Sequence, residues 1–228
     1  MKITWLGQAG LMLESGGKTV IVDPYLSDSV ERIEPKNRRR VAVDERFLHV
    51  KPDILVLTHN HLDHTDPDTL CHYLGEDTGV LVLASGNAWQ TVRKYGGNNN
   101  YVMFNRRTEW TEGDLRFCAV YAEHSDSAAI GCLIYAEGKT YYITGDTLYN
   151  EAIFEDLPDA IDYVFLPVNG VGNNMNFADG ARFCARLGAV AIPYHCGLFD
   201  ALDLSDFPYE PKVVPQFYQE IKLSGGKL

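Results

Sequence analysis

The sequence His-Asn-His-Leu-Asp-His at residues 59–64 gathers four potential metal ligands into six positions. It directly follows residues 53–57, Asp-Ile-Leu-Val-Leu, an apolar run typical of a fully buried strand. Neutral imidazoles and a carboxylate suit Zn²⁺, Mn²⁺ or Fe²⁺. A single His-x-His pair is weak evidence, but this longer segment after a buried strand predicts a metal site. The alternative, a histidine-rich surface loop, would leave unexplained why further candidate ligands also follow predicted strands.

Three such candidates lie elsewhere in the chain. His124 follows a predicted strand, Asp146 lies in a tight Thr-Gly-Asp turn, and His195 closes another strand. An isolated histidine at a strand end is as often structural, and an aspartate can serve a turn alone. However, five of the chain's seven histidines lie in the 59–64 segment or at these strand ends, which favours metal ligation. The other two, His49 and His72, are expected to be surface or packing residues.

The remaining pattern predicts a single α/β domain over residues 1–228, because no linker, low-complexity tract or repeat divides the chain. Strands are predicted over residues 2–6, 10–14, 18–23, 53–57, 80–84, 140–144, 161–167 and 189–193, with a β meander over 109–137. Helices are predicted over residues 68–74, 87–95, 178–187 and 214–222.

Charge restricts the partners of this chain. With 31 acidic and 20 basic residues the formal net charge is −11, which argues against a nucleic-acid partner. A small anionic substrate is still compatible with this negative net charge, since a metal cluster would supply local positive charge. The basic cluster Lys36 to Arg40 could recruit a phosphate or a carboxylate, although such a run is more often a solvated loop.

Cysteine usage and hydropathy bear on the compartment. The five cysteines are scattered and contain no Cys-x-x-Cys pair, which is typical of reduced thiols. The chain begins without a signal-like apolar region, and no apolar run approaches the length of a membrane span. We therefore expect a cytoplasmic protein with no membrane association.

The order of the His/Asp segment, His124, Gly-Asp146 and His195 resembles the metallo-β-lactamase superfamily. The resemblance covers almost the whole chain. It implies a four-layer αββα sandwich, in which two mixed β-sheets pack face to face, helices lie outside, and metals bind at one sheet edge. Residues 3–10, 22–25 and 190–195 are more narrowly similar to the branch that contains L-ascorbate-6-phosphate lactonase.

The same resemblance implies two divalent metal ions, with zinc expected first and manganese or iron as alternatives. Its ligand pattern assigns His59, His61 and His124 to one ion, Asp63, His64 and His195 to the other, and Asp146 to both. An anionic bridge is what two dications about 3.5–4 Å apart require, and the pair would lower the pKa of a shared water. Asp63 is the expected catalytic residue, orienting that water and passing its proton to the leaving group.

Weaker candidates surround these ligands. Thr58, Asp66 and Asp126 are placed to hydrogen-bond a ligating imidazole, although an aspartate in a turn is an equal alternative for Asp126. The Asn/Gly-rich loop after the strand 161–167 and the tyrosine beside His195 are candidate substrate contacts. These candidate substrate-binding residues are Asn169, Asn173 and Tyr194, with an ordinary turn and core packing as the alternatives.

Together the residues and the resemblance predict a metal-dependent hydrolase. The expected reaction is attack of water on a lactone, ester or amide of a small anionic substrate, which a phosphate group could carry. One alternative is a phosphodiesterase or nuclease of the same superfamily, which the net charge disfavours. Another is a metal- or ligand-sensing module without catalysis. A homo-oligomer is possible, because related lactonases assemble.

Overall fold

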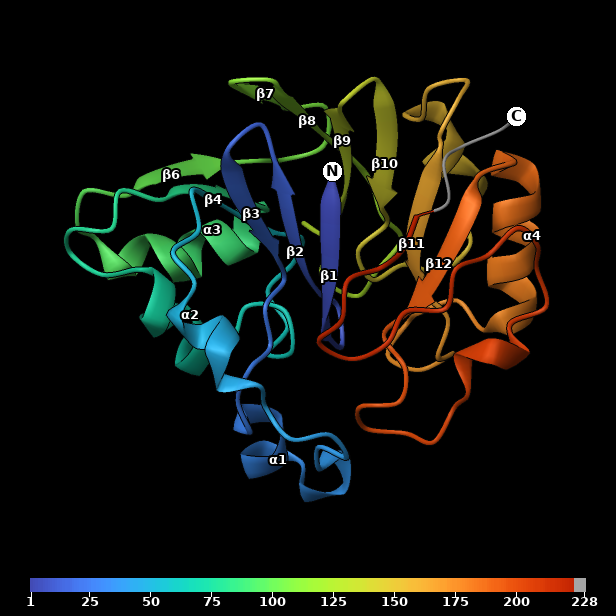
Figure 1. Cartoon of the computed structure of the whole chain (residues 1–228), viewed down its shortest axis with the longest axis horizontal. Helices are drawn as coiled ribbons and strands as arrows, with labels where there is room; N and C mark the ends of the chain where they lie inside the picture. Colours follow the sequence, from blue (N-terminus) through green and yellow to red (C-terminus); the bar gives the residue numbers. More distant parts are fainter. Residues whose placement is uncertain (224–228) are drawn as a thin grey trace.

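The structure is a computed structural model that describes residues 1–223, and its framework is a pair of six-stranded sheets (Figure 1). The first sheet has the order β1-β2-β3-β4-β5-β6. Its strands are β1 (Lys2–Gly7), β2 (Gly10–Ser15), β3 (Lys18–Val22), β4 (Ile54–Leu57), β5 (Leu81–Ala84) and β6 (Asn100–Met103). The first two pairings are antiparallel and the last three parallel, so the sheet is mixed.

The second sheet has the order β12-β11-β10-β9-β8-β7 and is also mixed. Its strands are β7 (Glu109–Glu112), β8 (Leu115–Tyr121), β9 (Ile130–Ala136), β10 (Lys139–Ile143), β11 (Tyr163–Pro167) and β12 (Val190–Tyr194). The meander β7 to β10 is antiparallel, and β10, β11 and β12 run parallel to one another.

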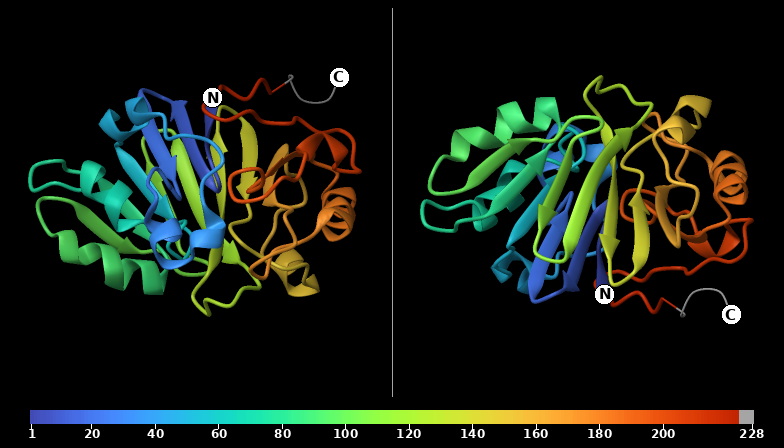
Figure 2. Two further views of the ribbon diagram at one scale, coloured as in Figure 1. Left: turned by 90° about the horizontal axis from the view of Figure 1, so that it is seen from below. Right: turned by 90° about the horizontal axis from the view of Figure 1, so that it is seen from above.

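Helices cover the outer faces of both sheets. The α-helices are α1 (Ser29–Ile33), α2 (Pro67–Tyr73), α3 (Gly86–Val92) and α4 (Phe177–Leu187). Short 3₁₀ helices cover Pro35–Asn37, Glu45–His49, Arg93–Tyr95, Glu151–Glu155 and Leu204–Asp206. Figure 2 shows α2 and α3 outside the first sheet and α4 outside the second, which confirms two mixed sheets flanked by helices in an α/β fold. Within the described residues, none of these helices has the length and hydropathy needed to cross a membrane.

The strand sequences explain this layering. β4 (Ile-Leu-Val-Leu) and β11 (Tyr-Val-Phe-Leu-Pro) are buried along their whole length, as expected for parallel strands covered on both faces. One apolar cluster joins the inner faces of the two sheets, and Trp5 and Phe165 belong to it. A second cluster packs the first sheet against α2, through residues such as Leu70. Packing within these two clusters fixes the strands, and therefore also the positions of their ends.

The helix predicted over residues 214–222 is wrong. The chain there follows the edge strand β1 with a turn at residues 217–218, and the Tyr218 N–H donates to the Trp5 carbonyl and the Ile221 N–H to the Ile3 carbonyl. Phe217 stacks on the Trp5 ring with centroids 4.3 Å apart. Apolar residues that could line a helix instead cover a sheet edge, whose unpaired backbone groups gain partners.

The sequence analysis also missed β6, the opposite edge strand of the first sheet. Its sequence Asn-Tyr-Val-Met follows a Gly/Asn-rich run, and its side chains are exposed or half-buried. Edge strands bury little apolar surface, so their sequence pattern is weak. The pairing with β5 defines β6, and that contact is not local in sequence.

Asp156, at the end of the 3₁₀ helix Glu151–Glu155, links the segment before β7 to the end of β8, and we expect Asp156→Asn to destabilise the fold. Its side chain is 4% exposed and accepts hydrogen bonds from Arg106, Arg107 and the Tyr121 N–H. Burial raises the pKa of this carboxyl, but these donors outweigh burial and hold the pKa below its ordinary value. Loss of charge-assisted bonds at a buried group costs about 1.5–3 kcal/mol. Urea unfolding at pH 7 measures this change in the free energy of unfolding.

The sign of the pH dependence follows from the lowered pKa. The carboxylate contributes its stabilisation above the unfolded-state pKa of about 4 and loses it as pH falls through the folded-state pKa. The difference in the free energy of unfolding between the wild type and Asp156→Asn should therefore become smaller in strong acid. Glu155→Gln is the matched control, because Glu155 is exposed and should change stability by less than about 0.5 kcal/mol. Equal effects of the two substitutions would contradict the assignment.

Candidate metal centre

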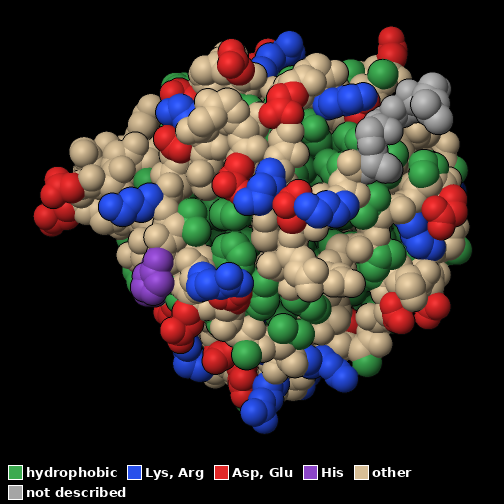
Figure 3. Space-filling view, in the orientation of Figure 1, with side chains coloured by type: hydrophobic (Ala, Val, Ile, Leu, Met, Phe, Trp, Pro, Cys, Tyr) green, Lys and Arg blue, Asp and Glu red, His purple; other side chains and the backbone are tan. Residues whose placement is uncertain are grey.

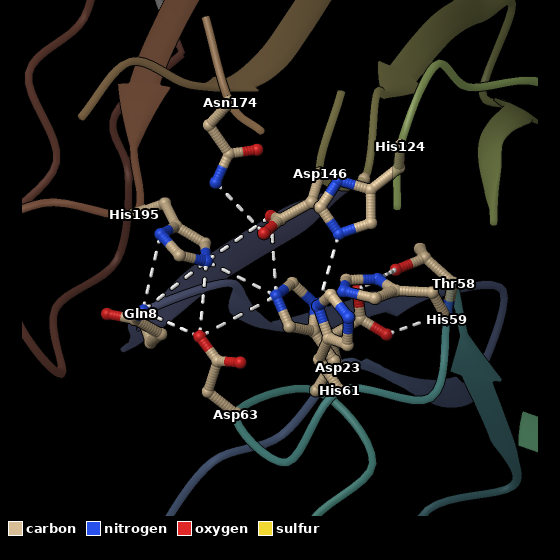
Figure 4. A network of polar contacts seen from close by, with 12 residues as sticks. Gln8, Asp23, Thr58, His59, His61, Asp63, His124, Asp146, Asn174 and His195 are labelled. Atoms are coloured by element: carbon tan, nitrogen blue, oxygen red, sulfur yellow. Dashed lines mark hydrogen bonds and ion pairs between the residues drawn. The ribbon is translucent and has the colours of Figure 1, made fainter. Parts of the chain in front are cut away.

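The first group of candidate ligands forms where β4 and β8 end. His59 and His61 lie in the loop after β4, and His124 lies in the loop after β8 (Figure 4). Their ligand nitrogens lie within 4.8 Å of one another, and His124 Nε2 is 3.1 Å from His61 Nδ1. The structure thus brings together the three residues that the sequence assigned to one ion.

The second group contains Asp63, His64 and His195. The backbone N–H of His64 donates to the His61 carbonyl, which turns the loop, and the His64 ring lies beside the His59 ring of the first group, with centroids 3.9 Å apart. His64 Nε2 is 3.2 Å from His195 Nε2, and His195 Nε2 is 3.5 Å from Asp63 Oδ2. These ligand atoms also lie within 4.8 Å of one another. The second predicted set converges as well.

Asp146 lies between the two groups. It follows β10, and its Oδ1 is 3.3 Å from the Nε2 atoms of both His64 and His195. It also forms a possible ligand group with His59 and His64. Gly145 allows this position: its φ is +61°, and a Cβ there would lie 2.6 Å from the Ile130 carbonyl oxygen. The predicted bridging position of Asp146 agrees with this geometry.

The polar atoms of the centre fit divalent metal ions. Within the described residues, His59 Nε2 is buried with no hydrogen-bond partner, and Asp146 Oδ1 faces two imidazole nitrogens without the geometry of a hydrogen bond. Buried groups left in this state are costly. Imidazole nitrogens and carboxylate oxygens that converge in this way are the donor set of zinc, manganese and iron sites. The residues present therefore fit two such ions.

Burial and neighbouring charges shift the pKa values of these ligands in opposite directions. Burial, reinforced by the charge of His64, lowers the pKa of His59. Burial also disfavours the charged form of His64, but nearby carboxylates outweigh it and raise the pKa of that imidazole. For Asp146, burial is outweighed by His195 and His64, so the pKa of the carboxyl is lowered. The carboxylates are thus held in the ionised form that ligation requires.

Asp23 is a functional residue that the sequence analysis missed. It lies directly after β3, fully buried, and its Oδ2 is 3.0 Å from His64 Nδ1. It also accepts hydrogen bonds from the backbone N–H and the hydroxyl of Thr58. The Thr58 Oγ1 is in turn 3.1 Å from His59 Nδ1, so the predicted bond between Thr58 and a ligating imidazole is present. Asp23 therefore orients ligands of both groups.

Amide side chains donate hydrogen bonds to the two candidate ligands Asp63 and Asp146. Gln8 Nε2 donates to Asp63 Oδ2 at 2.8 Å, and Asn174 Nδ2 donates to Asp146 Oδ2 at 2.9 Å. Gln8 lies in the β1–β2 turn with φ +47°, a conformation that costs energy in a residue other than glycine. The sequence offered only an indirect signal for Gln8, its position in a Gly-Gln-Ala-Gly turn, and none for its contact with Asp63.

The structure places three of the weaker candidate residues differently from their predicted roles. Asp66 caps α2 by accepting from the Thr69 N–H, and none of the contacts described for it is with an imidazole. Asp126 accepts from the Asn60 backbone N–H, so it holds the ligand loop by the main chain instead of through an imidazole. Tyr194 is fully buried, and it does not line the cavity over the ligands, a position that favours core packing over substrate contact.

A cavity of about 360 Å³ opens over the ligands. Asp63, Asp146 and His195 line it, as do both predicted substrate contacts of the loop after β11, Asn169 and Asn173. Asn169 Nδ2 lies 3.2 Å from His195 Nδ1, so this side chain also contacts a ligand. A substrate in this cavity would lie directly against the candidate centre.

We expect Asp23→Asn to weaken metal binding about 10- to 100-fold, the usual cost of losing a carboxylate that orients a ligating histidine. The amide keeps the shape of the side chain but cannot accept from His64 and Thr58 as a carboxylate does. Competition with a chromogenic chelator measures the affinity. Asp66→Asn is the matched control, since Asp66 is equally buried and contacts no ligand. Asp66→Asn should leave metal affinity unchanged, and an equal loss in both variants would contradict the role of Asp23.

Two mixed sheets, outer helices and a His/Asp centre at the strand ends define the class of metal-dependent hydrolases built on the metallo-β-lactamase fold. The chain belongs to the family described as the beta-lactamase superfamily domain, whose profile matches residues 2–195.

Among curated relatives, it is similar to a UPF0173 metal-dependent hydrolase of Shouchella clausii, with 29% identity over 217 residues and 87% of each chain covered. A Staphylococcus aureus protein of the same description is 29% identical over 222 residues, with 89% of each chain covered.

Two solved structures share the fold. A possible metal-dependent hydrolase from Veillonella parvula superposes with a TM-score of 0.80 at 18% identity, covering 98% of this chain and 99% of the other. The isothiocyanate hydrolase from Delia radicum gut bacteria superposes with a TM-score of 0.75 at 21% identity, covering 99% and 100%. The fold of the chain is therefore that of its family along its described length.

Proposed function

We propose that this metal-dependent hydrolase cleaves a lactone, ester or amide bond in a small molecule. One observation carries the proposal: ligand atoms of seven side chains converge below an open cavity, and His59 Nε2 is buried there without a hydrogen-bond partner. Buried polar atoms usually have hydrogen-bond partners, and divalent cations would supply the missing partners here.

The ligand assignment follows the three geometric groups. His59, His61 and His124 would hold one divalent ion, Asp63, His64 and His195 a second, and Asp146 both. When bound, such ions supply Lewis acidity and a water of lowered pKa. Asp23 and Thr58 would keep the imidazoles in the required tautomers, because each contacts the Nδ1 atom of a ligating histidine.

Asp63 would move the proton in the reaction. It is the second-group ligand that is partly exposed to the cavity, and Gln8 fixes its Oδ2. Water oxygen forms a bond to the carbonyl carbon and the bond to the leaving oxygen or nitrogen breaks. Asp63 accepts the proton of the water and returns it to the leaving group. Such proton transfer contributes about 10²- to 10⁴-fold to a rate.

A panel of substrates tests the proposal. The protein is loaded with zinc, manganese or iron and assayed with lactones, thioesters and bis(p-nitrophenyl) phosphate. An isothiocyanate belongs in the panel, because a fold neighbour is an isothiocyanate hydrolase and that reaction is also the addition of water to an electrophilic carbon. We expect turnover of at least one acyl compound, lost on chelation and restored by metal.

Other outcomes would overturn this proposal. Turnover of the phosphodiester alone would make the protein a phosphodiesterase. Full metal loading with no turnover of any panel member would favour a sensing module. His61→Ala controls for adventitious activity, since His61 belongs to the first ligand group and its loss should abolish turnover together with metal binding at that group.

A further inference from the structure

Part of the lining of the cavity over the candidate metal centre is apolar. Val30 of α1, Val171 of the loop after β11 and Phe199 of the loop after β12 all line it. Phe199 is held in place by Tyr25, with the two rings edge to face at a centroid distance of 5.7 Å. Val171 is 67% exposed, so it lies at the mouth of the cavity. An apolar group of a bound molecule would remove these side chains from water.

Another part of the lining consists of uncharged amides. Gln8, Asn37, Asn169 and Asn173 line the cavity, and Gln8 and Asn169 are directed at ligands of the centre (Figure 4 for Gln8). Amide groups donate and accept hydrogen bonds without charge, so they suit carbonyl, hydroxyl or amide groups of a substrate.

Among the described residues that line this cavity, none is a lysine or an arginine. The one charged lining residue outside the ligand set is Asp200, and its Oδ1 accepts from the backbone N–H groups of Gly197 and Leu202. A phosphate or carboxylate distant from the metals would therefore meet no cationic partner, and an anion buried without one is costly.

The basic side chains of the cluster Lys36 to Arg40 are not among the residues that line this cavity. The Arg39 side chain is 4% exposed and donates to the Tyr25 carbonyl and the Tyr218 hydroxyl, so its role is structural. Arg38 Nε lies 3.9 Å from Glu31 Oε1, and both residues line a different cavity. Figure 3 shows basic side chains interspersed with acidic ones over the face that it presents.

The backbone of the loop after β11 is also partly occupied. Gly170 and Val171 could offer N–H groups to an anion, because positive φ angles alternate along this loop. However, the Gly170 N–H donates to the Met175 carbonyl and the Val171 N–H to Asn169 Oδ1. Those two donors are not free to bind a substrate phosphate.

We propose that the substrate is uncharged outside its reacting group and carries an apolar substituent that packs against Val30, Val171 and Phe199. This inference rests on the proposed hydrolase function and specifies its substrate class. It replaces the phosphorylated substrate expected from the sequence with small neutral lactones, esters or amides. Both kinds of lining residue contribute: amides bind the polar atoms next to the reacting group, and the apolar side chains bind the substituent.

Ligands that are not hydrolysed test the inference by binding alone. Benzohydroxamate and its 4-phosphono derivative share a metal-binding group and differ in the charge of the distal end. Calorimetry with the zinc-loaded protein at physiological salt should show benzohydroxamate binding at least about 10-fold more tightly, the effect of leaving a buried anion unpaired. Phe199→Ala should weaken benzohydroxamate binding about 10-fold, because a large apolar contact is lost.

A charge introduced at the mouth gives a matched comparison. Val171→Lys should reduce the preference for benzohydroxamate several-fold by pairing the phosphonate. Ile33→Lys adds the same charge at an exposed position, 72% accessible, that does not line the cavity, and it should leave the preference unchanged. Arg38→Ala should also leave the preference for benzohydroxamate unchanged.

Equal or tighter binding of the phosphono compound to the wild-type protein would overturn the inference. It would leave the hydrolase proposal standing, because that proposal depends on turnover of the substrate panel. Conversely, the expected preference without any turnover would support the binding inference and refute the hydrolase. A preference that Ile33→Lys and Val171→Lys reduce equally would also overturn the inference, since bulk charge would then explain it.

Discussion

Asp146→Asn is expected to lose at least one equivalent of bound metal and about a thousand-fold in kcat/KM. The amide keeps the size of the side chain and an acceptor for Asn174, but it removes the negative charge that lies 3.3 Å from both His64 and His195. Charge stabilisation by a bound metal is worth several kcal/mol in a transition state, and about 4 kcal/mol corresponds to a thousand-fold. Elemental analysis of the purified variant and kinetics on the best panel substrate measure the two losses.

Asp200→Asn is the control for this substitution. Asp200 lines the same cavity, carries the same charge, and bonds only backbone N–H groups of its own loop among the contacts described for it. Its metal content should equal that of the wild-type protein. If Asp146→Asn retained the full metal content, or if the Asp200 variant lost as much, Asp146 would not be a ligand shared by the two groups.

The convergence of the candidate ligands could be predicted from the sequence because each of these residues follows a strand. A buried apolar run such as β4 is recognisable by composition, and the residues after parallel strands meet at one sheet edge. His124, Asp146 and His195 each follow a strand of the second sheet, and the structure brings them to the loop after β4. For these residues, the local sequence pattern and the chain topology indicate the same location.

The residues that orient the ligands could not be predicted in the same way. Asp23 contacts His64, which lies 41 positions later, and Gln8 contacts Asp63, which lies 55 positions later. Such contacts depend on the register of the β1–β2 turn and β3 against β4, and an isolated Asp or Gln in a turn has many other roles. Tyr194 is the converse case: its position beside His195 suggested a substrate contact, with core packing as the alternative, and its buried side chain at the end of β12 is not among the residues that line the cavity.

The net charge restricted the partners of the whole molecule, but it did not predict which side chains line the cavity. The excess of 11 negative charges allowed an anionic substrate only through the positive charge of bound metals. In the structure, amides and apolar side chains line the cavity beside the candidate ligands, and Asp200 is the charged lining residue outside the ligand set. A local lining of this kind is set by loops after β11 and β12 and by α1, segments whose sequences carry no periodic signal.

Asp63→Asn is expected to lower kcat about 10²- to 10⁴-fold, the contribution of a positioned group that transfers a proton. The amide can still accept from Gln8, so the loop geometry should persist, and circular dichroism should be unchanged. Kinetics are measured at saturating metal, which separates a loss of catalysis from a loss of affinity at the second ligand group. Asp63→Glu restores a carboxylate and should recover part of the rate. A full rate in Asp63→Asn at saturating metal would transfer the proton-transfer role to another group of the cavity, whereas equal losses in both variants would show that Asp63 acts through ligand geometry alone.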